Sequence, residues 1–477
     1  MRPAILVNPD SAIPLRRQIY QEWRKAILTG RFHRGDQVPS SRELAVTLGI
    51  SRSTVTEAYE QLAAEGYLES AHGSGTYVCR HIPDELLKAR RAPANGAAAN
   101  TSIRLSRYGL RLREDLDQHR AAPGVIQFSS GRPDLSQFPF RVWRKLLGRH
   151  VREAKPQLFD YAEQSAGYEP LRREVAASLS RSRAVRCTAE QVVIVNGSQQ
   201  GLDLCVRLLL EPGDVVALEE PGYQGARRVF STYGARLRPA RVDAEGIVIR
   251  DLGKKARLVY VTPSHQFPAG ISMSLARRLE LLDWARRSGA TLIEDDYAAE
   301  YRYNGPPLPA LQGLAADVPV VYIGTFSKVM FPGLRIGYVI VPPQLVRPLT
   351  RAKWLADRHT PVLEQAALAD FIREGHLERH IRRMRRLYGR RREALVEAIA
   401  HHFGDRAEIL GDAAGMHVLV RFEDGAMLER TARNRVQVVN SQYCYLNKTA
   451  HHELVLGFSE LGERTIREGI RRLAGNA

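Results

Sequence analysis

The most informative stretch of this chain is GTFSKVMFPGLR, residues 324–335, in which Lys328 stands among hydroxyl side chains and Arg335 follows. Upstream of it, the run TLIEDDY, residues 291–297, begins apolar and ends in acids and a tyrosine. A buried carboxylate, a lysine in a hydroxyl-rich turn and a nearby arginine are the groups that hold pyridoxal phosphate (PLP). The lysine forms a Schiff base, the carboxylate keeps the pyridine nitrogen protonated, and the hydroxyls and the arginine take the phosphate. The two segments together predict a PLP site.

Length and composition indicate a protein of several domains. At 477 residues the chain is too long for one small core, so we expect two or three domains. Its four cysteines suit a reduced, cytoplasmic protein, and no two of them have the spacing of a metal or redox pair. We expect no signal peptide and no membrane span, because no apolar segment is long enough. The net charge of +18 favours a polyanionic partner.

The N-terminal segment predicts two short helices about a tight turn. An amphipathic helix over residues 14–28 comes first, with Trp23 on its apolar face. The stretch PSSRELAVTLG, residues 39–49, then gives a helix with a serine cap and an acid in its first turn. After the turn at Gly49, the stretch SRSTVTEAYEQL, residues 51–62, opens the next helix. This pattern is typical of a helix-turn-helix, which lays its second helix in the major groove of DNA.

Two strand-like runs around a glycine-rich turn, within residues 67–78, read as a β-hairpin wing. With the PSSRELA stretch, residues 39–45, this assembly over residues 11–79 resembles the winged-helix domain of the GntR family of bacterial regulators. We take residues 1–79 as this domain and expect DNA, with repeated half-sites, as its partner. The residues that the resemblance places against DNA are Ser41, Arg42, Arg52, Ser53, Thr54, His72 and Gly73.

Residues 80–122 read as a linker, because APANGAAAN, residues 92–100, has no apolar periodicity. An amphipathic segment around residues 104–116 either begins the next domain or lies on its surface. The densest basic run is residues 379–392, where Ile381, Met384 and Leu387 recur every three residues and give one stripe that can be buried. Its arginines form either a solvated helix face or a second surface that faces DNA.

From residue 123 to residue 477, apolar strand candidates alternate with helical stretches, which predicts an α/β domain with a mostly parallel sheet. Ligands of such sheets lie beyond the carboxyl ends of the strands. There the stretch NGSQQG, residues 196–201, follows a strand and starts a helix, so its free backbone N–H groups offer an anion site.

Ordered motifs in this domain resemble those of a fold-type I aminotransferase, and the fused winged helix makes the whole chain similar to a MocR-type regulator. The motifs are SGRPD (130–134), GSQQGLD (197–203), EPGY (220–223), TPSHQFPAG (262–270), DDY (295–297) and the lysine stretch. The resemblance implies that Lys328 forms the Schiff base with PLP and that Asp295 pairs with the pyridinium nitrogen. It also implies that Tyr297 bonds the phenolic oxygen of the cofactor and that Tyr223 stacks on its ring.

By the same resemblance the phosphate is held by Ser198, Gln199, Thr325, Ser327 and Arg335. Tyr161 would reach the phosphate of a partner subunit, which implies a homodimer.

The chain departs from the aminotransferase pattern at two places. The stretch FPAG, residues 267–270, replaces the usual Asn-Pro-x-Gly, so one hydrogen bond to the phenolic oxygen is missing. The arginine that usually clamps the carboxylate of an amino acid should lie a few residues before Gly457. This chain has HHELVL there, residues 451–456, without an arginine, and Glu453 would repel a carboxylate. Either the effector lacks that carboxylate, or another arginine such as Arg227 or Arg421 substitutes, or PLP itself is the effector.

Our interpretation is a homodimeric, PLP-dependent transcriptional regulator in which the Schiff base on Lys328 senses a small amine or amino acid and alters operator binding or transcription. Three alternatives stay open: a regulator that senses PLP and controls vitamin B6 synthesis, a working aminotransferase with a DNA-binding appendage, and a repressor with an inert scaffold. We expect the chain to be a regulator rather than an enzyme, with a residual half-reaction of the aminotransferase type still open.

Overall fold

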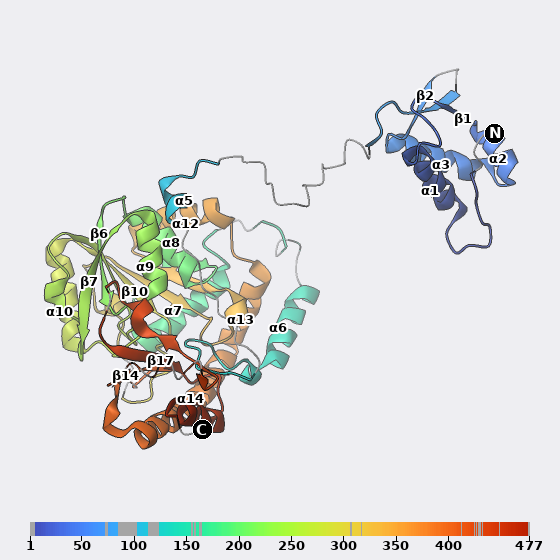
Figure 1. Cartoon of the computed structure of the whole chain (residues 1–477). Helices are drawn as coiled ribbons and strands as arrows, with labels where there is room; N and C mark the ends of the chain where they lie inside the picture. Colours follow the sequence, from blue (N-terminus) through green and yellow to red (C-terminus); the bar gives the residue numbers. More distant parts are fainter. Residues whose placement is uncertain are drawn as a thin grey trace. The chain divides into compact units, whose positions relative to one another are not determined.

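The computed structural model describes residues 5–71, 75–83, 103–112, 124–153, 156, 159–161, 165–305, 308–315, 317–411, 413–423, 425, 427, 431, 433–447 and 449–475. The predicted DNA contacts His72 and Gly73, and most of the predicted linker, lie outside these residues. The chain divides into two compact units, residues 1–104 and 105–477, each of which is described by itself (Figure 1).

The described part of the first unit contains the helices α1 (Leu15–Leu28), α2 (Ser41–Leu48) and α3 (Arg52–Ala64). A capping box starts α2, because the Ser40 side chain accepts from the backbone of Glu43 and the Glu43 carboxylate accepts from the backbone of Ser40. Gly49 ends the helix with φ 66°, a left-handed conformation that glycine adopts without strain. The predicted helix-turn-helix is thus confirmed, with its turn at the predicted glycine.

The wing contains one strand more than the sequence indicates. β2 (Leu68–Ala71) and β3 (Gly75–Val78) pair antiparallel, and β1 (Gln37–Val38) adds to the other edge of β3. A strand of two residues is too short to show the alternation of apolar and polar side chains, so the sequence does not predict β1.

The core of the first unit is built around Trp23. Its side chain is fully buried and packs against Phe32 and Tyr59, with ring centroids 4.6 and 5.9 Å away.

An eight-stranded sheet lies at the centre of the second unit, in the order β5-β12-β11-β10-β9-β6-β7-β8. The strands from β11 to β7 in this order are parallel to one another, as predicted, and β12 and β8 run antiparallel to their neighbours. Their bounds are β5 (Val192–Val195), β6 (Val215–Glu220), β7 (Arg236–Asp243), β8 (Gly246–Ile247), β9 (Ala256–Val261), β10 (Thr291–Asp296), β11 (Val320–Thr325) and β12 (Gly337–Ile340).

Helices cover both faces of this sheet (Figure 1). They are α7 (Glu169–Arg183), α8 (Ser198–Leu209), α9 (Gln224–Tyr233), α10 (Leu275–Ser288), α11 (Leu311–Leu314), α12 (Pro343–Asp357) and α13 (Val362–Arg373). Alternate residues of one strand enter different cores: Val192 and Ile194 lie in one hydrophobic cluster, and Val193 and Val195 lie in another. Burial on both faces explains why the strands read as continuous apolar runs.

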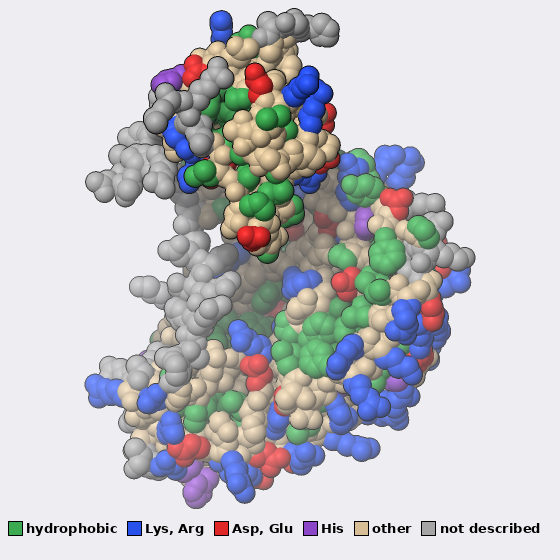
Figure 2. All heavy atoms as spheres, turned by 90° about the vertical axis from the view of Figure 1, so that its right-hand side faces the viewer, with side chains coloured by type: hydrophobic (Ala, Val, Ile, Leu, Met, Phe, Trp, Pro, Cys, Tyr) green, Lys and Arg blue, Asp and Glu red, His purple; other side chains and the backbone are tan. Residues whose placement is uncertain are grey.

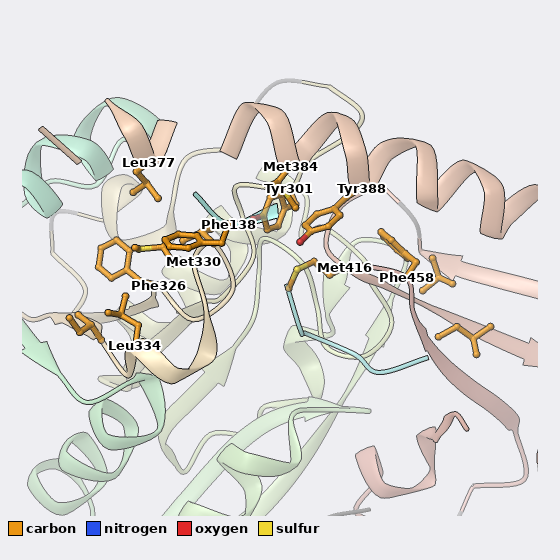
Figure 3. Packing of buried hydrophobic residues seen from close by; sticks show 14 of the residues in the cluster. Phe138, Tyr301, Phe326, Met330, Leu334, Leu377, Met384, Tyr388, Met416 and Phe458 are labelled. Atoms are coloured by element: carbon orange, nitrogen blue, oxygen red, sulfur yellow. The ribbon is translucent and has the colours of Figure 1, made fainter. Parts of the chain in front are cut away.

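The C-terminal part of the chain forms a second, smaller sheet with two helices beside it. The four-stranded sheet β13-β14-β17-β16 is antiparallel and consists of β13 (Ala407–Gly411), β14 (His417–Phe422), β17 (His452–Gly457) and β16 (Val439–Asn440). The long helix α14 (His376–Phe403) and α16 (Glu463–Leu473) pack together beside it, and β4 (Ile126–Gln127) pairs with β15 (Val436–Gln437). Met384 and Tyr388 point from α14 into the core (Figure 3).

Two further helices complete the described part of this unit, α5 (Arg107–Arg111) and α6 (Phe140–Glu153). Arg111 donates to the carbonyl of Thr232, and the Tyr108 and Tyr233 rings lie 5.8 Å apart. The described part of the 104–116 segment therefore lies on the surface of α9. Among the described residues no helix combines the length and apolar character that a membrane crossing requires, and all four cysteines are free thiols.

Candidate cofactor site and DNA-contacting surface

A cavity of about 260 Å³ lies where strands β9, β10 and β11 end. It is the place that the topology of a parallel sheet offers to a ligand. The described residues that line it are Ser130, Gly131, Ser198, Gln199, Tyr223, Tyr260, Thr262, Phe267, Asp295, Tyr297, Thr325, Ser327, Lys328, Arg335 and His417. Every cofactor-binding residue predicted from the sequence lines this cavity except Tyr161.

Lys328 follows β11 and reaches into the cavity. Its Nζ donates to the carbonyl of Gly131 at 2.8 Å, and a Cβ added at Gly131 would come within 2.9 Å of that nitrogen. Burial lowers the pKa of Lys328 below the usual range for lysine, although the Asp295 carboxylate opposes the effect. A lowered pKa raises the fraction of neutral amine, which is the form that attacks an aldehyde.

Asp295 lies on β10 and is 6% exposed. Its Oδ2 accepts from the hydroxyl of Tyr260 at 2.6 Å, whereas its Oδ1 has no partner among the described residues. Burial raises the pKa of this carboxyl group to about 6. A buried, unpaired carboxylate oxygen on the wall of a cavity matches a ring N–H donor.

Two more buried oxygens point to the same kind of ligand. The hydroxyl groups of Tyr297 and Ser327 have no hydrogen-bond partner among the described residues. Tyr223 lies at the rim with 37% of its surface exposed, and its ring meets that of Phe267 edge-on at 5.8 Å. The wall thus holds polar atoms that fit the phenolic oxygen and the phosphate of PLP, beside aromatic surface for its ring.

The phosphate end of the cavity is built at the start of α8. Gly197 caps this helix with φ 88°, and a Cβ there would lie 2.7 Å from a guanidinium nitrogen of Arg335. Arg335 donates to the carbonyl of Asn196 at 3.1 Å, so its guanidinium is held beside the free N–H groups of the first helical turn. A helix N-terminus with an arginine and hydroxyl groups fits a phosphate.

Tyr161 is 81% exposed and its ring lies 6.4 Å from that of His359. It does not line the cavity of its own subunit, so its contact with a partner subunit stays a prediction.

Sequence reasoning missed the roles of Tyr260 and His417. Tyr260 is the one hydroxyl-bearing residue in the apolar strand run LVYV, residues 258–261. A lone hydroxyl in a buried strand indicates a buried hydrogen-bond partner, and that partner is Asp295. His417 is buried, with its ring 4.8 Å from that of His265, and lines the cavity from the distant strand β14. Burial lowers the pKa of His417 below its usual range, so its ring is neutral at pH 7.

Glu453 is buried in a network of its own on β17. Its carboxylate accepts from Ser441 at 3.0 Å, from Tyr445 at 2.8 Å and from Arg421 at 2.9 Å. Arg227 donates instead to the carbonyls of Tyr443 and Tyr445. Neither of the two arginines considered as substitute carboxylate ligands lines the cavity.

In the first unit, the predicted DNA contacts lie at the starts of two helices. Ser41 and Arg42 open α2, and Arg52, Ser53 and Thr54 form the first turn of α3. The Nε of Arg52 lies 3.4 Å from the Oγ of Ser41, so the two helix starts adjoin. Arg42, Arg52 and Ser53 are exposed.

Comparison with known proteins gives two family matches along the chain. Residues 15–78 match the bacterial regulatory proteins of the gntR family, and residues 123–451 match aminotransferase class I and II. Among solved structures, a kynurenine aminotransferase of Pyrococcus horikoshii has 31% identity and a TM-score of 0.69, over 74% of this chain and 90% of that one. The class is thus a GntR-family regulator whose second unit has an aminotransferase fold.

Full-length relatives narrow the family. A probable rhizopine catabolism regulatory protein, MocR of Rhizobium meliloti, is 38% identical, over 98% of this chain and 95% of the relative. The pyridoxine biosynthesis transcriptional regulator PdxR of Corynebacterium glutamicum is 32% identical, over 97% and 96%. The chain belongs to the MocR-type transcriptional regulators, as its motifs predicted.

Proposed function

We propose that this regulator binds PLP on Lys328 and uses it to sense a small amine or amino acid, with a change in DNA binding or transcription as the response. The observation that carries the proposal is the set of buried oxygens without partners around one lysine: Asp295 Oδ1, Tyr297 Oη and Ser327 Oγ. Leaving such atoms unpaired costs free energy, so a site that gathers three of them is suited to a polar ligand.

When bound, PLP supplies an aldehyde that condenses with primary amines. The residues of the chain have separate tasks around it. Lys328 offers a buried amine of lowered pKa, and Asp295, oriented by Tyr260, would hold a proton on the pyridine nitrogen. Tyr297 would donate to the phenolic oxygen. Arg335 and the hydroxyl groups of the phosphate end would fix the cofactor while an effector amine competes with Lys328.

For the effector to change binding to repeated half-sites, the regulator needs two copies of its DNA-binding unit. We place Tyr161 against the phosphate of a partner subunit, which makes the regulator a homodimer that reads repeated half-sites. Hydrophobic side chains gather on one face of the second unit, with Lys and Arg around them (Figure 2). A contiguous hydrophobic surface of this kind marks protein interfaces. An effector that alters the second unit would then alter the DNA affinity of both heads.

A second candidate signal is PLP itself. It is favoured by the lack of an arginine among residues 451–456, the stretch in which the resemblance to aminotransferases places the ligand of the substrate carboxylate. The name of the Corynebacterium relative, a pyridoxine biosynthesis regulator, points the same way.

The visible absorption spectrum with added PLP tests both signals. The variants are wild type, Lys328→Ala, and Lys255→Ala as a control for the loss of one exposed lysine. We expect a band in wild type and control that is lost or displaced in Lys328→Ala and that shifts with one amine of a titrated series. A band that ignores every amine would make PLP the signal. Equal spectra for all three proteins would refute the proposal.

A further inference from the structure

One side of α14 carries a row of five exposed arginines, Arg379, Arg382, Arg383, Arg386 and Arg390. They line a groove of about 400 Å³ together with Gln137 and Leu387. At 100° per residue these five positions fall within an arc of about 100° of the helix. The row is therefore one surface of the second unit and not a set of scattered charges.

The opposite side of the helix is fixed in the core. Leu377, His380, Met384 and Tyr388 are buried there, and Figure 3 shows Met384 and Tyr388 turned inward. Ile381 and Leu387, expected in the buried stripe, are only partly buried. Because the core holds α14 by this face, the direction of the arginine row is fixed as well.

Two other arginines of the same helix make contacts with the rest of the unit. Arg391 is buried against Asp134 at 2.7 Å, and Arg385 donates to the carbonyl of Glu300 at 2.8 Å. These side chains attach α14 to the rest of the unit. In the row itself, Arg379 donates to the carbonyl of Glu374 and Arg383 to that of Gln137, but all five arginines stay exposed and line the groove.

The charge of the row is only partly balanced. Arg390 lies 3.3 Å from Glu463 and Arg382 lies 4.0 Å from Glu378, and the side chains of both arginines remain about 60% exposed. Neighbours at spacings of three and four, such as Arg382 and Arg386, repel one another and destabilise the helix. A helix selected only for stability would alternate acids with bases on this face, so the row indicates a polyanionic ligand.

We propose that the arginine row of α14 is a second contact with DNA, made to the phosphodiester backbone by the unit that also holds the cofactor site. From Arg379 to Arg390 the helix rises about 16 Å. At 3.4 Å of duplex axis per phosphate of one strand, this length faces about five phosphates. The GntR-type head supplies sequence recognition in this arrangement, and the row adds affinity that does not depend on sequence.

Salt dependence of binding measures such contacts directly. The full-length protein would be titrated with a mixed-sequence 60-bp duplex at several salt concentrations, as wild type and as the triple variant Arg382→Gln, Arg386→Gln and Arg390→Gln. A matched control loses three exposed positive charges elsewhere, at Arg250, Lys254 and Lys255. The plot of log K against log salt has a negative slope, and each lost phosphate contact makes that slope shallower by about 0.9.

We expect the slope of the row variant to be shallower than that of wild type by up to about 2.7, and the slope of the control to stay near wild type. Between 50 and 200 mM salt, wild-type affinity would then fall about 40-fold more than that of the row variant. A slope that is unchanged, or that falls equally in the control, would overturn the proposal. The visible PLP band stays a separate test, so failure of the cofactor proposal is distinguishable from failure of this one.

Discussion

Asp295 and Asp296 are adjacent buried carboxylates for which we predict opposite effects of the same substitution. Asp296 accepts from Arg183 at 2.9 Å and from the Tyr322 hydroxyl at 2.7 Å, inside the sheet. Asp295 accepts from the Tyr260 hydroxyl. Among the described residues one oxygen of each carboxylate has no hydrogen-bond partner, but Asp296 has a guanidinium against it and Asp295 has none. In the protein freed of PLP, Asp295→Asn should therefore stabilise the second unit and Asp296→Asn should destabilise it.

The expected gain follows from the pKa of Asp295. Burial raises that pKa from 3.8 to about 6, and this difference corresponds to about 3 kcal/mol against the charged form at pH 7. Because the folded protein holds the proton more tightly than the unfolded chain, the contribution is fully present below pH 3.8 and is lost as the pH rises through about 6. Asparagine resembles the protonated form at every pH. Its advantage over aspartate should fall to about half at pH 5.

The expected loss at Asp296 has a different origin. Its replacement by asparagine leaves the Arg183 guanidinium, which is 8% exposed, without its carboxylate. Breaking a buried ion pair from one side costs about 3–5 kcal/mol. Urea unfolding of both variants at pH 5 and pH 7, with and without PLP, measures these differences. PLP should stabilise wild type far more than Asp295→Asn. If Asp295→Asn destabilised the PLP-free protein at pH 7, the assignment of Asp295 as a cofactor partner would be refuted.

The remaining predictions concern parts of the fold away from the cavity. Glu453→Leu should lower the free energy of unfolding by about 3 kcal/mol, because Ser441 and Tyr445 lose their acceptor, while Arg421 still reaches water. Trp23→Ala should destabilise the first unit by about 3–5 kcal/mol and abolish sequence-specific DNA binding with an unchanged PLP band; a lost band would show that the second unit depends on the first. Ser40→Ala should cost about 1 kcal/mol in thermal unfolding through loss of the capping box, and Ser40→Gly only a few tenths, since glycine is tolerated at that position.

The sequence was most informative where local rules decide the structure. The Ser40 cap and Gly49 locate the helix-turn-helix without any tertiary contact, because capping and left-handed glycine are local properties. Continuous apolar runs predicted the parallel strands for a similar reason, since burial on both faces removes the alternation. The short strand β1 exists only because Gln37 and Val38 lie opposite Tyr77 and Thr76, a long-range pairing that no local pattern records.

The cofactor site shows the same division. Motifs next to Lys328 and Asp295 could be read from the chain, because strand ends and helix starts converge at one edge of a parallel sheet. His417 arrives from β14, in a separate sheet, and nothing in its neighbourhood in the sequence indicates a cavity. Tyr260 became meaningful only through the register that places β9 beside β10, which brings its hydroxyl to Asp295.

The surroundings of Glu453 explain why an acid stands at this position of β17. In register, Glu453 on β17 lies opposite Arg421 on β14, and Ser441 and Tyr445 donate to the same carboxylate. An arginine at this position would lose those two donors and face a second arginine, so the acid is built into the packing of both strands. The network therefore holds β14 and β17 together apart from the cavity, whose lining does not include Glu453.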